Sequence, residues 1–244
     1  MGNNLIYGMH PIIEAIKSGQ HIDKLFIQKN LKGSLSNSLF DLLKEKNISF
    51  NSVPIEKLNR LTRENHQGVV GYISPVKIYK LEALLEEKNE VAHKTYILLD
   101  GITDPRNFGA IIRTAAAIDA TGIIIPENNS APINEDVIKT SAGGIFKIPI
   151  SKVKHLKDAI FLLQSYEIIT VAATEKTDNL VYGADFKKDF ALIMGSEGRG
   201  IQSSILNLCD EKVKLPMSEH ISSLNVSVAC GIILYESVRQ RMTI

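Results

Sequence analysis

The sequence predicts an α/β protein in which a mostly parallel sheet is covered by helices. Four short apolar runs without polar alternation lie at 96–99, 122–125, 168–172 and 190–194. Such runs are typical of strands that are buried on both faces of a sheet. Helical patterns fall between the runs, which is the alternation expected of a parallel sheet with helices on its faces. A long helix is predicted over 226–242, where most positions are apolar.

A smaller α/β unit is predicted over residues 1–75. Strand-like runs at 24–27 and 69–73 alternate with helical runs that start at Pro11 and Leu39. Proline suits the first turn of a helix, and about 75 residues suffice for a domain. Residues 76–94 are polar at both ends of a helical run, so we expect them to link this unit to a domain formed by residues 95–244.

Composition excludes several classes of protein. The chain is 44% hydrophobic and 23% charged, as in ordinary globular proteins. It has no apolar run of about 18 residues for a membrane span, and its first residues lack the pattern of a signal peptide. Cys209 and Cys230 have neither metal-ligand spacing nor the pattern of a disulfide framework. We therefore expect a cytoplasmic protein with reduced thiols that binds no metal and no membrane.

Charge is unevenly distributed along the chain. The net charge is +1, which argues against a protein that coats nucleic acid without selectivity. Residues 1–75 nevertheless carry nine Lys and Arg against six Asp and Glu, a net charge of +3. A surface of this kind is commonly just solvated, and it gains meaning when the rest of the chain indicates a polyanionic substrate.

Three loops that follow predicted strands are rich in polar residues, and ligands bind at the carboxyl ends of strands in parallel α/β sheets. The first loop places Asn107 near a helix start and Arg113 inside the helix. Burying an arginine among Ile and Ala is costly unless it meets an anion or a carboxylate. Arg113 thus predicts either an anionic ligand or a structural ion pair.

The second loop, at 194–201, has three glycines within six residues and Glu197 among them. Glycine lets a backbone approach a ligand closely, but the spacing matches neither the dinucleotide-binding nor the P-loop pattern. A tight turn with a solvated Glu197 is the alternative interpretation.

The third loop brings Ser222, Ser223 and Asn225 just before the last predicted helix. Helix capping accounts for one of these residues, but not for all three. Three polar loops at strand ends of one domain together predict a single ligand site.

These loops resemble the motifs of a known enzyme family. Asn107 followed by Arg113, Gly-Ser-Glu-Gly-Arg-Gly at 195–200 and Ser-Leu-Asn-Val-Ser at 223–227 are similar, in order and spacing, to the signatures of the SpoU (TrmH) family. Its members are S-adenosylmethionine-dependent RNA ribose 2′-O-methyltransferases of the SPOUT superfamily. The similarity covers residues 95–244 and implies a deep trefoil knot that holds the cofactor.

The front of the chain also resembles part of this family. Residues 7–15 and 66–69 are similar to a small RNA-binding domain, itself similar to ribosomal protein L30e. This domain occurs in bacterial enzymes that methylate a guanosine of 23S rRNA. The resemblance therefore implies RNA as the partner, either 23S rRNA or a ribosome precursor. We expect this domain to contact phosphates through Lys57, Arg60, Arg63 and His66, an ordinary polar turn being the alternative.

The resemblance also assigns roles in the larger domain. It implies backbone contacts with S-adenosylmethionine at Gly195, Leu215 and Leu224, with Thr174 on the adenosine side. The residues assigned to catalysis are Asn107, Arg113, Glu197, Ser223 and Asn225. Arginine is a poor general base because its reference pKa lies above ~12, so Arg113 either accepts the ribose proton in a special environment or clamps a phosphate. Glu197 is expected to orient Arg113 or its loop.

Family members are homodimers through the knotted domain, with the active site near the interface. A homodimer is therefore expected here, and the apolar helix predicted over 226–242 suits burial in such an interface.

Three other functions were weighed against this one. A tRNA ribose methyltransferase of the same family is disfavoured because such enzymes often carry basic terminal extensions, whereas this sequence ends at 239–244 without a basic tail. A non-catalytic RNA-binding relative is expected to have lost Asn107, Arg113 or Glu197, and all three are present. A nicotinamide-dependent oxidoreductase is disfavoured because no predicted strand is followed by Gly-x-Gly-x-x-Gly.

Overall fold

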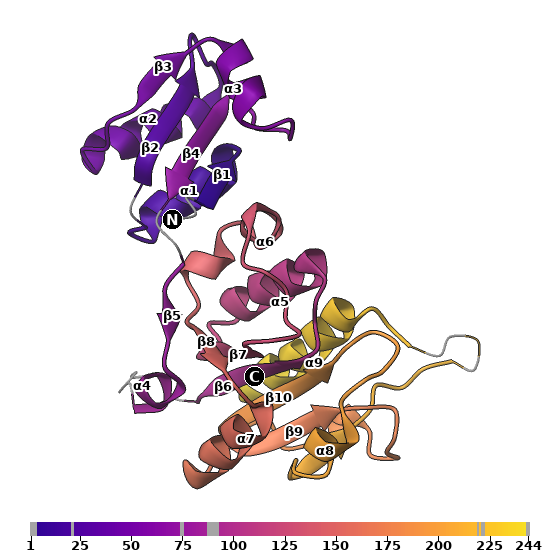
Figure 1. The fold of residues 1–244 in the computed structure, drawn as a ribbon. Coiled ribbons are helices and arrows are strands. Elements are labelled where there is room, and N and C mark those ends of the chain that lie inside the picture. The colour runs from indigo at the N-terminus through magenta and orange to yellow at the C-terminus, as the bar shows by residue number, and fades with distance from the viewer. Residues whose placement is uncertain are drawn as a thin grey trace. The chain divides into compact units, whose positions relative to one another are not determined.

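The computed structural model describes residues 4–20, 22–73, 76–86, 93–218, 220 and 223–242. Over these residues the fold contains a seven-stranded sheet and a four-stranded sheet (Figure 1). The larger sheet has the order β11-β9-β10-β6-β7-β8-β5, and every neighbouring pair in it is parallel. Its strands are β5 (Ile78–Tyr79), β6 (Thr95–Asp100), β7 (Gly122–Pro126), β8 (Ile150–Val153), β9 (Ile169–Ala173), β10 (Phe190–Gly195) and β11 (Glu211–Val213).

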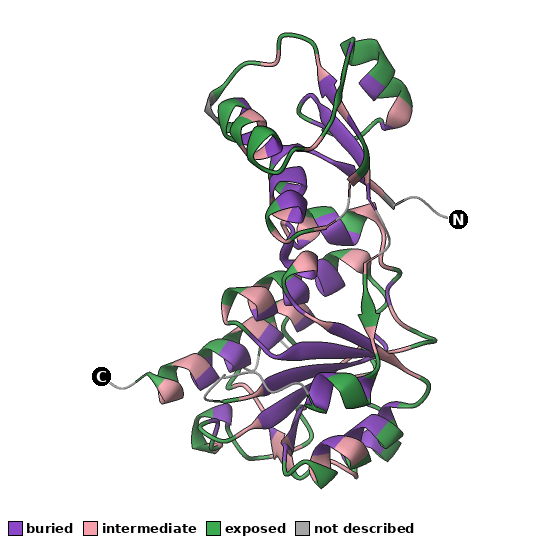
Figure 2. Ribbon diagram, turned by 90° about the vertical axis from the view of Figure 1, so that its left-hand side faces the viewer, coloured by how far each residue is buried: buried purple, intermediate pink, exposed green. Residues whose placement is uncertain are grey.

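The central strands of this sheet are buried on both faces (Figure 2). Every residue of β6 is buried, and its register with β10 pairs Ile97 with Leu192 and Leu99 with Met194. Because side chains alternate along a strand, Tyr96 and Leu98 face the opposite side from these two pairs. Fully apolar strands without polar alternation are the result, so the interpretation of the apolar runs is confirmed.

Helices cover both faces of the larger sheet. On one face, a core formed with Tyr96 and Leu98 includes residues from α4 (Leu81–Glu86), α7 (Leu156–Ser165) and α8 (Ser203–Leu206). The other face carries α5 (Pro105–Ala117) and α9 (Val226–Arg241), which lie side by side (Figure 1). The long final helix is therefore confirmed, and it packs against the helix that carries Asn107.

Both ends of α9 are anchored by polar contacts. At its start, Asn225 Oδ1 accepts hydrogen bonds from Ser227 N at 3.0 Å and Val228 N at 3.4 Å. At its end, the Arg241 guanidinium donates to the backbone oxygens of Phe186 and Lys188 and to Thr95 Oγ1, at 2.7–2.8 Å. These contacts fix the position of α9, and with it the residues just before it.

The smaller sheet has the order β1-β4-β2-β3. Its β1–β4 and β2–β4 pairs are antiparallel, and its β2–β3 pair is parallel. Helices from the same part of the chain flank this sheet, so residues at the front of the chain form a small α/β unit, as expected. The elements are β1 (Asn4–Tyr7), α1 (Met9–Lys17), β2 (Ile22–Gln28), α2 (Ser34–Glu45), β3 (Asn51–Val53), α3 (Ile55–Leu61) and β4 (Val69–Ile73).

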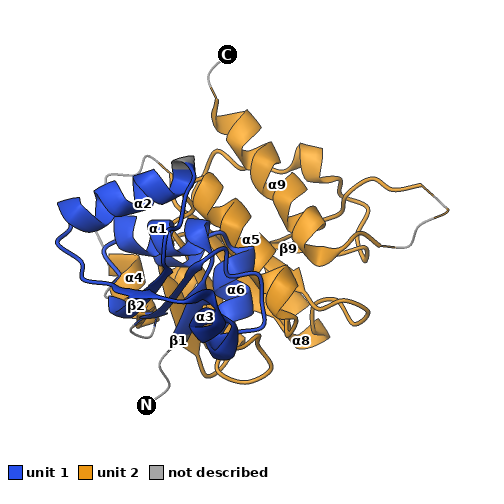
Figure 3. Cartoon of the chain, turned by 90° about the horizontal axis from the view of Figure 1, so that it is seen from above, with its two compact units in different colours: residues 1–76, 133–147 blue, residues 77–132, 148–244 orange. Residues whose placement is uncertain are grey.

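The chain divides into two compact units that are not the same as two continuous segments (Figure 3). One unit contains residues 1–76 and also 133–147, which carry α6 (Glu135–Thr140) and η1 (Gly144–Phe146). Lys147 Nζ lies 2.6 Å from Glu14 Oε2 in this unit. The other unit contains residues 77–132 and 148–244.

The stretch expected to be a linker contributes structure to the larger unit. Strand β5 pairs with β8 at the edge of the sheet, and Leu81, Leu84 and Leu85 of α4 are at most 5% exposed. The helical run predicted within 76–94 covers residues 81–88, of which 87 and 88 lie outside the described residues. The buried leucines are spaced three and four residues apart, which is the signal of a helix packed on a core.

The knot and the likeness of the smaller unit to ribosomal protein L30e stay predictions. No helix among the described residues is long and apolar enough to cross a membrane.

Candidate active site

Four strand ends gather at one edge of the larger sheet. Asp100 ends β6 and Gly195 ends β10, and the two residues are register partners. Thr174 follows β9, and its backbone N–H donates to Val213 O of β11 at 2.9 Å. All these strands are parallel, so their carboxyl ends and the loops that follow share this edge, where α/β sheets bind ligands.

A hydrogen-bond network joins all three polar loops. Glu197 Oε1 accepts from Asn107 Nδ2 at 3.0 Å and from Asn225 Nδ2 at 2.8 Å. Asn225 Nδ2 also donates to Asn107 Oδ1 at 2.9 Å. The residues are 28 to 118 positions apart in sequence, so the fold brings them together. The three loops therefore meet at these three side chains, where a single site was expected.

The network has a buried side and an open side. Asn107 is 9% exposed on the first turns of α5, whereas Glu197 and Asn225 are exposed. Glu197 is thus not the freely solvated turn residue of the alternative interpretation. Its second carboxylate oxygen, Oε2, accepts no hydrogen bond within the described part of the chain, so it is available to a ligand.

The loop after β10 folds tightly back on its own strand. Gly200 N donates to Ser196 O at 2.9 Å, and these two residues also form an isolated bridge. Gly198 and Gly200 have φ values of 84° and 67°, where residues with a Cβ are strained. At Gly195 a Cβ would overlap the backbone of Gly200 and Ile201. Each of these three positions therefore has a backbone reason to be glycine.

Asp100 and Gln202 form a second contact that sequence reasoning missed. Asp100 is 3% exposed, and its carboxylate accepts from Gln202 N and from Gln202 Nε2, both at 2.8 Å. This pair ties the end of β6 to the end of the glycine loop. A carboxylate directly after a buried strand was the available signal.

Arg113 lies away from the network within the single chain. It is exposed on α5, and its side chain makes no hydrogen bond or ion pair with any described residue. Six residues of helix separate it from Asn107, which turns the two side chains by about 120°. The argument from the cost of burying this arginine is therefore wrong, and so is the alternative of an ion pair. The expected contact with Glu197 is not formed here.

The residues predicted to contact the cofactor lie along the same edge. Thr174 is 9% exposed, Leu215 is half-buried and Leu224 is 37% exposed. Leu224 is an apolar side chain left open beside polar loops, which suits the apolar parts of an adenosine or a methionine. Ser223 is exposed and makes no hydrogen bond with a described residue, and Ser222 lies outside the described residues. The backbone glycines and open leucines fit S-adenosylmethionine.

The predicted RNA-contacting residues of the smaller unit fall into two groups. Lys57, Arg60 and Arg63 are exposed, and Lys57 Nζ lies 5.1 Å from the centre of the Phe26 ring. His66 is 7% exposed. Its Nε2 is 2.8 Å from Asn59 Oδ1, and its Nδ1 accepts from Gly68 N at 2.9 Å.

His66 therefore holds the turn before β4 in place. Burial lowers the pKa of His66, which disfavours the charged imidazolium that would contact a phosphate. Of the four residues predicted to contact RNA, Lys57, Arg60 and Arg63 are the exposed cations.

The two cysteines are partly or fully buried. Both cysteines are free, and burial raises the pKa of Cys209 to about 11 and that of Cys230 to about 12, which keeps both as unreactive thiols at neutral pH. Among the described residues, no three His, Cys, Asp or Glu side chains are grouped to hold a metal ion.

Comparisons with known proteins agree with this geometry. Residues 94–235 match the model of the SpoU rRNA Methylase family, and residues 5–79 match that of the RNA 2′-O ribose methyltransferase substrate binding domain. The chain belongs to the SpoU rRNA Methylase family. Its three polar loops lie within the first match, and Lys57, Arg60 and Arg63 lie within the second.

Relatives and solved structures cover nearly the whole chain. A Staphylococcus haemolyticus protein named as a TrmH family tRNA/rRNA methyltransferase is 34% identical over 99% of this chain and 97% of its own. The SpoU methyltransferase AviRb of Streptomyces viridochromogenes, in complex with AdoMet, is 26% identical with a TM-score of 0.82, covering 98% of this chain and 91% of its own.

The AdoMet-bound rRNA methyltransferase of Sinorhizobium meliloti is 25% identical, also with a TM-score of 0.82, covering 99% and 88%. The SpoU family member described here is accordingly an S-adenosylmethionine-dependent RNA methyltransferase, and its larger sheet has the SPOUT fold.

Proposed function

We propose that this enzyme transfers a methyl group to a ribose 2′-oxygen, on a guanosine of 23S rRNA. The observation that carries the proposal is the Asn107–Glu197–Asn225 network, because it joins the three family motifs at the carboxyl edge of a parallel sheet. The RNA 2′-O ribose methyltransferase substrate binding domain at residues 5–79 supports ribose as the acceptor.

Some of these residues bind the cofactor, and others align the ribose. The sulfonium of S-adenosylmethionine supplies an already activated methyl group, so the difficult part is the weakly acidic ribose hydroxyl. Glu197 Oε2 and the Asn107 amide offer hydrogen-bonding groups that orient the ribose for attack. Gly195, Leu215, Leu224 and Thr174 bind the cofactor. Arg113 is the candidate that activates the hydroxyl or clamps the adjacent phosphate.

A homodimer would bring Arg113 to a complete site. Beside Arg113, α5 and α9 expose a shallow apolar surface around Ala110, Val228 and Ile232, and Tyr235 is 55% exposed there. Exposed apolar patches of this kind mark protein interfaces. A self-complementary contact through this surface would cover it and place Arg113 at the subunit boundary, since Arg113 does not reach the network of its own chain.

Mapping of ribose methylation tests the substrate. We expect a deletion strain to lack one 2′-O-methylguanosine in 23S rRNA, and the purified enzyme with S-adenosylmethionine to restore it on rRNA from that strain. Restored methylation of tRNA instead would favour the alternative of a tRNA ribose methyltransferase, which the names of the Staphylococcus relatives also allow. Loss of neither would contradict the proposal.

Neutralising the cations of the smaller unit should weaken RNA binding. Replacing Lys57, Arg60 and Arg63 together by alanine is expected to raise the Kd for 23S rRNA by about tenfold and to reduce its salt dependence, because fewer counterions are released on binding. Affinity for S-adenosylmethionine should not change. Filter binding at several salt concentrations measures the first, and calorimetry the second.

A matched control is available in the same unit. Lys44, Lys46 and Lys29 are exposed and outside α3, so their replacement removes the same charge elsewhere. Equal losses in both triple variants would show a general charge effect and contradict a specific RNA surface.

A further inference from the structure

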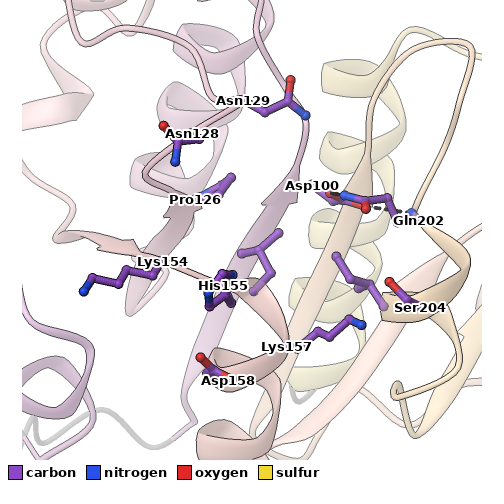
Figure 4. Close-up of a pocket in the computed structure, with 12 residues that line it drawn as sticks. Asp100, Pro126, Asn128, Asn129, Lys154, His155, Lys157, Asp158, Gln202 and Ser204 are labelled. Carbon is purple, nitrogen blue, oxygen red and sulfur yellow. Dashed lines mark hydrogen bonds between the residues drawn. The ribbon is translucent and has the colours of Figure 1, made fainter.

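A cavity lies beside the candidate active site in the larger unit (Figure 4). It measures about 460 Å³, within the range of pockets that hold small organic ligands. Its walls come from the ends of β6, β7 and β8 and from the starts of α7 and α8. Position at the carboxyl edge and size therefore both indicate a ligand site.

The side chains at this cavity suit a nucleotide. Lys154, His155 and Lys157 surround the start of α7, and Asn128 and Asn129 belong to the loop after β7 (Figure 4). All five are exposed. Neither lysine forms an ion pair within the described part of the chain. Unpaired ammonium groups bind phosphates, amides bind base edges, and an imidazole ring stacks on a base.

Two carboxylates also face the cavity. Asp100 is buried, and its two oxygens accept hydrogen bonds from Gln202, so it forms part of the wall. Asp158 is exposed in the first turn of α7 and offers an acceptor to the amino group of a base. Two carboxylates at the same cavity as two lysines disfavour a site for a free anion. They are compatible with a ligand that has both a phosphate and a base.

The cavity adjoins the network of the candidate active site. A neighbouring hollow of about 320 Å³ is lined by Glu197 and Arg199 and shares Asp100, Asn129 and Gln202 with the larger cavity. The two hollows therefore share a wall at these three residues.

We propose that this cavity binds one unpaired nucleotide of the RNA substrate, adjacent to the nucleotide that is methylated. Lys154 and Lys157, whose side chains extend in opposite directions (Figure 4), contact the phosphates on its two sides, His155 stacks on its base, and Asn128 and Asn129 hydrogen-bond to the base edge. The inference rests on the proposed function, because it assumes an RNA substrate whose reacting ribose lies at Glu197.

The test uses the full-length enzyme with Lys154 and Lys157 both replaced by alanine. We expect its Kd and KM for a 23S rRNA transcript to rise about tenfold, and its log Kd against log salt slope to fall by about 1.4 for two single-stranded phosphates. We expect kcat at saturating RNA and affinity for S-adenosylmethionine to stay within about twofold, because neither group touches the reacting atoms.

The matched control removes Lys187 and Lys188. Both are exposed and precede β10, at the opposite edge of the sheet, so their loss should leave the RNA affinity unchanged. A second variant, Asn128→Ala, should weaken RNA binding about fivefold without changing the salt slope, because an amide releases no counterion. It also separates nucleotide recognition from charge.

The outcomes distinguish this inference from the proposed function. If the wild-type enzyme methylates rRNA while the Lys154 and Lys157 variant matches its control, the nucleotide site is refuted and the proposed function stands. If the wild-type enzyme methylates neither rRNA nor tRNA, the proposed function is refuted, and the inference is refuted with it because it requires an RNA substrate. Calorimetric binding of inorganic phosphate that depends on the two lysines, with unchanged RNA affinity, would show an anion site and overturn the proposal.

Discussion

Arg113→Ala is expected to lower kcat for methyl transfer by about a thousandfold, within the range for loss of a group that assists proton transfer. Affinity for S-adenosylmethionine should stay within about threefold, because Arg113 lies on α5 and not in the loops after β9, β10 and β11. Steady-state methylation at saturating RNA measures the first quantity and calorimetry the second. Wild-type turnover in the variant would remove Arg113 from the mechanism.

Arg113→Lys tests whether the positive charge of this residue suffices or whether its planar guanidinium is required. If Arg113 clamps a phosphate by charge alone, lysine should retain a substantial part of the activity, because it also binds phosphate. If the planar, bidentate guanidinium is required, lysine should be nearly as inactive as alanine. The ratio of the two variants, measured at saturating RNA, distinguishes these outcomes.

Mixed dimers test whether Arg113 acts across a subunit boundary. Arg113→Ala and Glu197→Ala chains should each be inactive alone. If Arg113 completes the site of the partner subunit, random mixing gives half mixed dimers with one intact site of two, or about a quarter of wild-type activity. If it acts within its own chain, each site carries one defect and mixing restores nothing.

The sequence predicted the strands that are buried on both faces better than those at the edges. The runs at 96–99, 122–125 and 190–194 coincide with β6, β7 and β10, because complete burial requires an apolar residue at every position. Strand β8, which lies between β7 and β5, was missed, and so were the edge strands β5 and β11. These edge strands have two and three residues, too few to show a period, and their pairing is decided by neighbours far away in sequence.

The same limit applies to the candidate site. Asn107, Glu197 and Asn225 were named from the loops, but local sequence does not show that one carboxylate oxygen joins them. For Arg113 the sequence argument predicted a burial that the structure does not show. Its apolar neighbours in sequence suggested burial, yet helix periodicity turns Ile111 and Ile112 inward and leaves Arg113 outside. Residues 133–147 could not be assigned to the smaller unit either, since only tertiary contacts decide that.

Gly195→Ala is expected to have the second large effect, on cofactor binding and on stability together. The added Cβ would overlap the backbone atoms of Gly200 and Ile201, so the loop must move away from the end of β10. Backbone shifts from overpacking cost about 1–3 kcal/mol. We expect a loss of about 3 kcal/mol in the free energy of unfolding of the larger unit and no measurable binding of S-adenosylmethionine.

Two glycine controls make this prediction specific. At Gly183 a Cβ meets nothing within 4 Å and φ is not positive, so Gly183→Ala should change stability by less than about 0.5 kcal/mol. At Gly200 the space is also open, but φ is +67°, so alanine should cost about 1 kcal/mol through backbone strain alone.

Denaturant unfolding and calorimetry on the three variants distinguish overlap from strain. If Gly195→Ala and Gly200→Ala lose equal stability and both bind the cofactor, the contact between the strand end and its loop is not what shapes the site. Loss of binding in Gly195→Ala alone would place the cofactor contact at the point where the loop folds back on β10, because Gly195 is where the backbone leaves no room for a side chain.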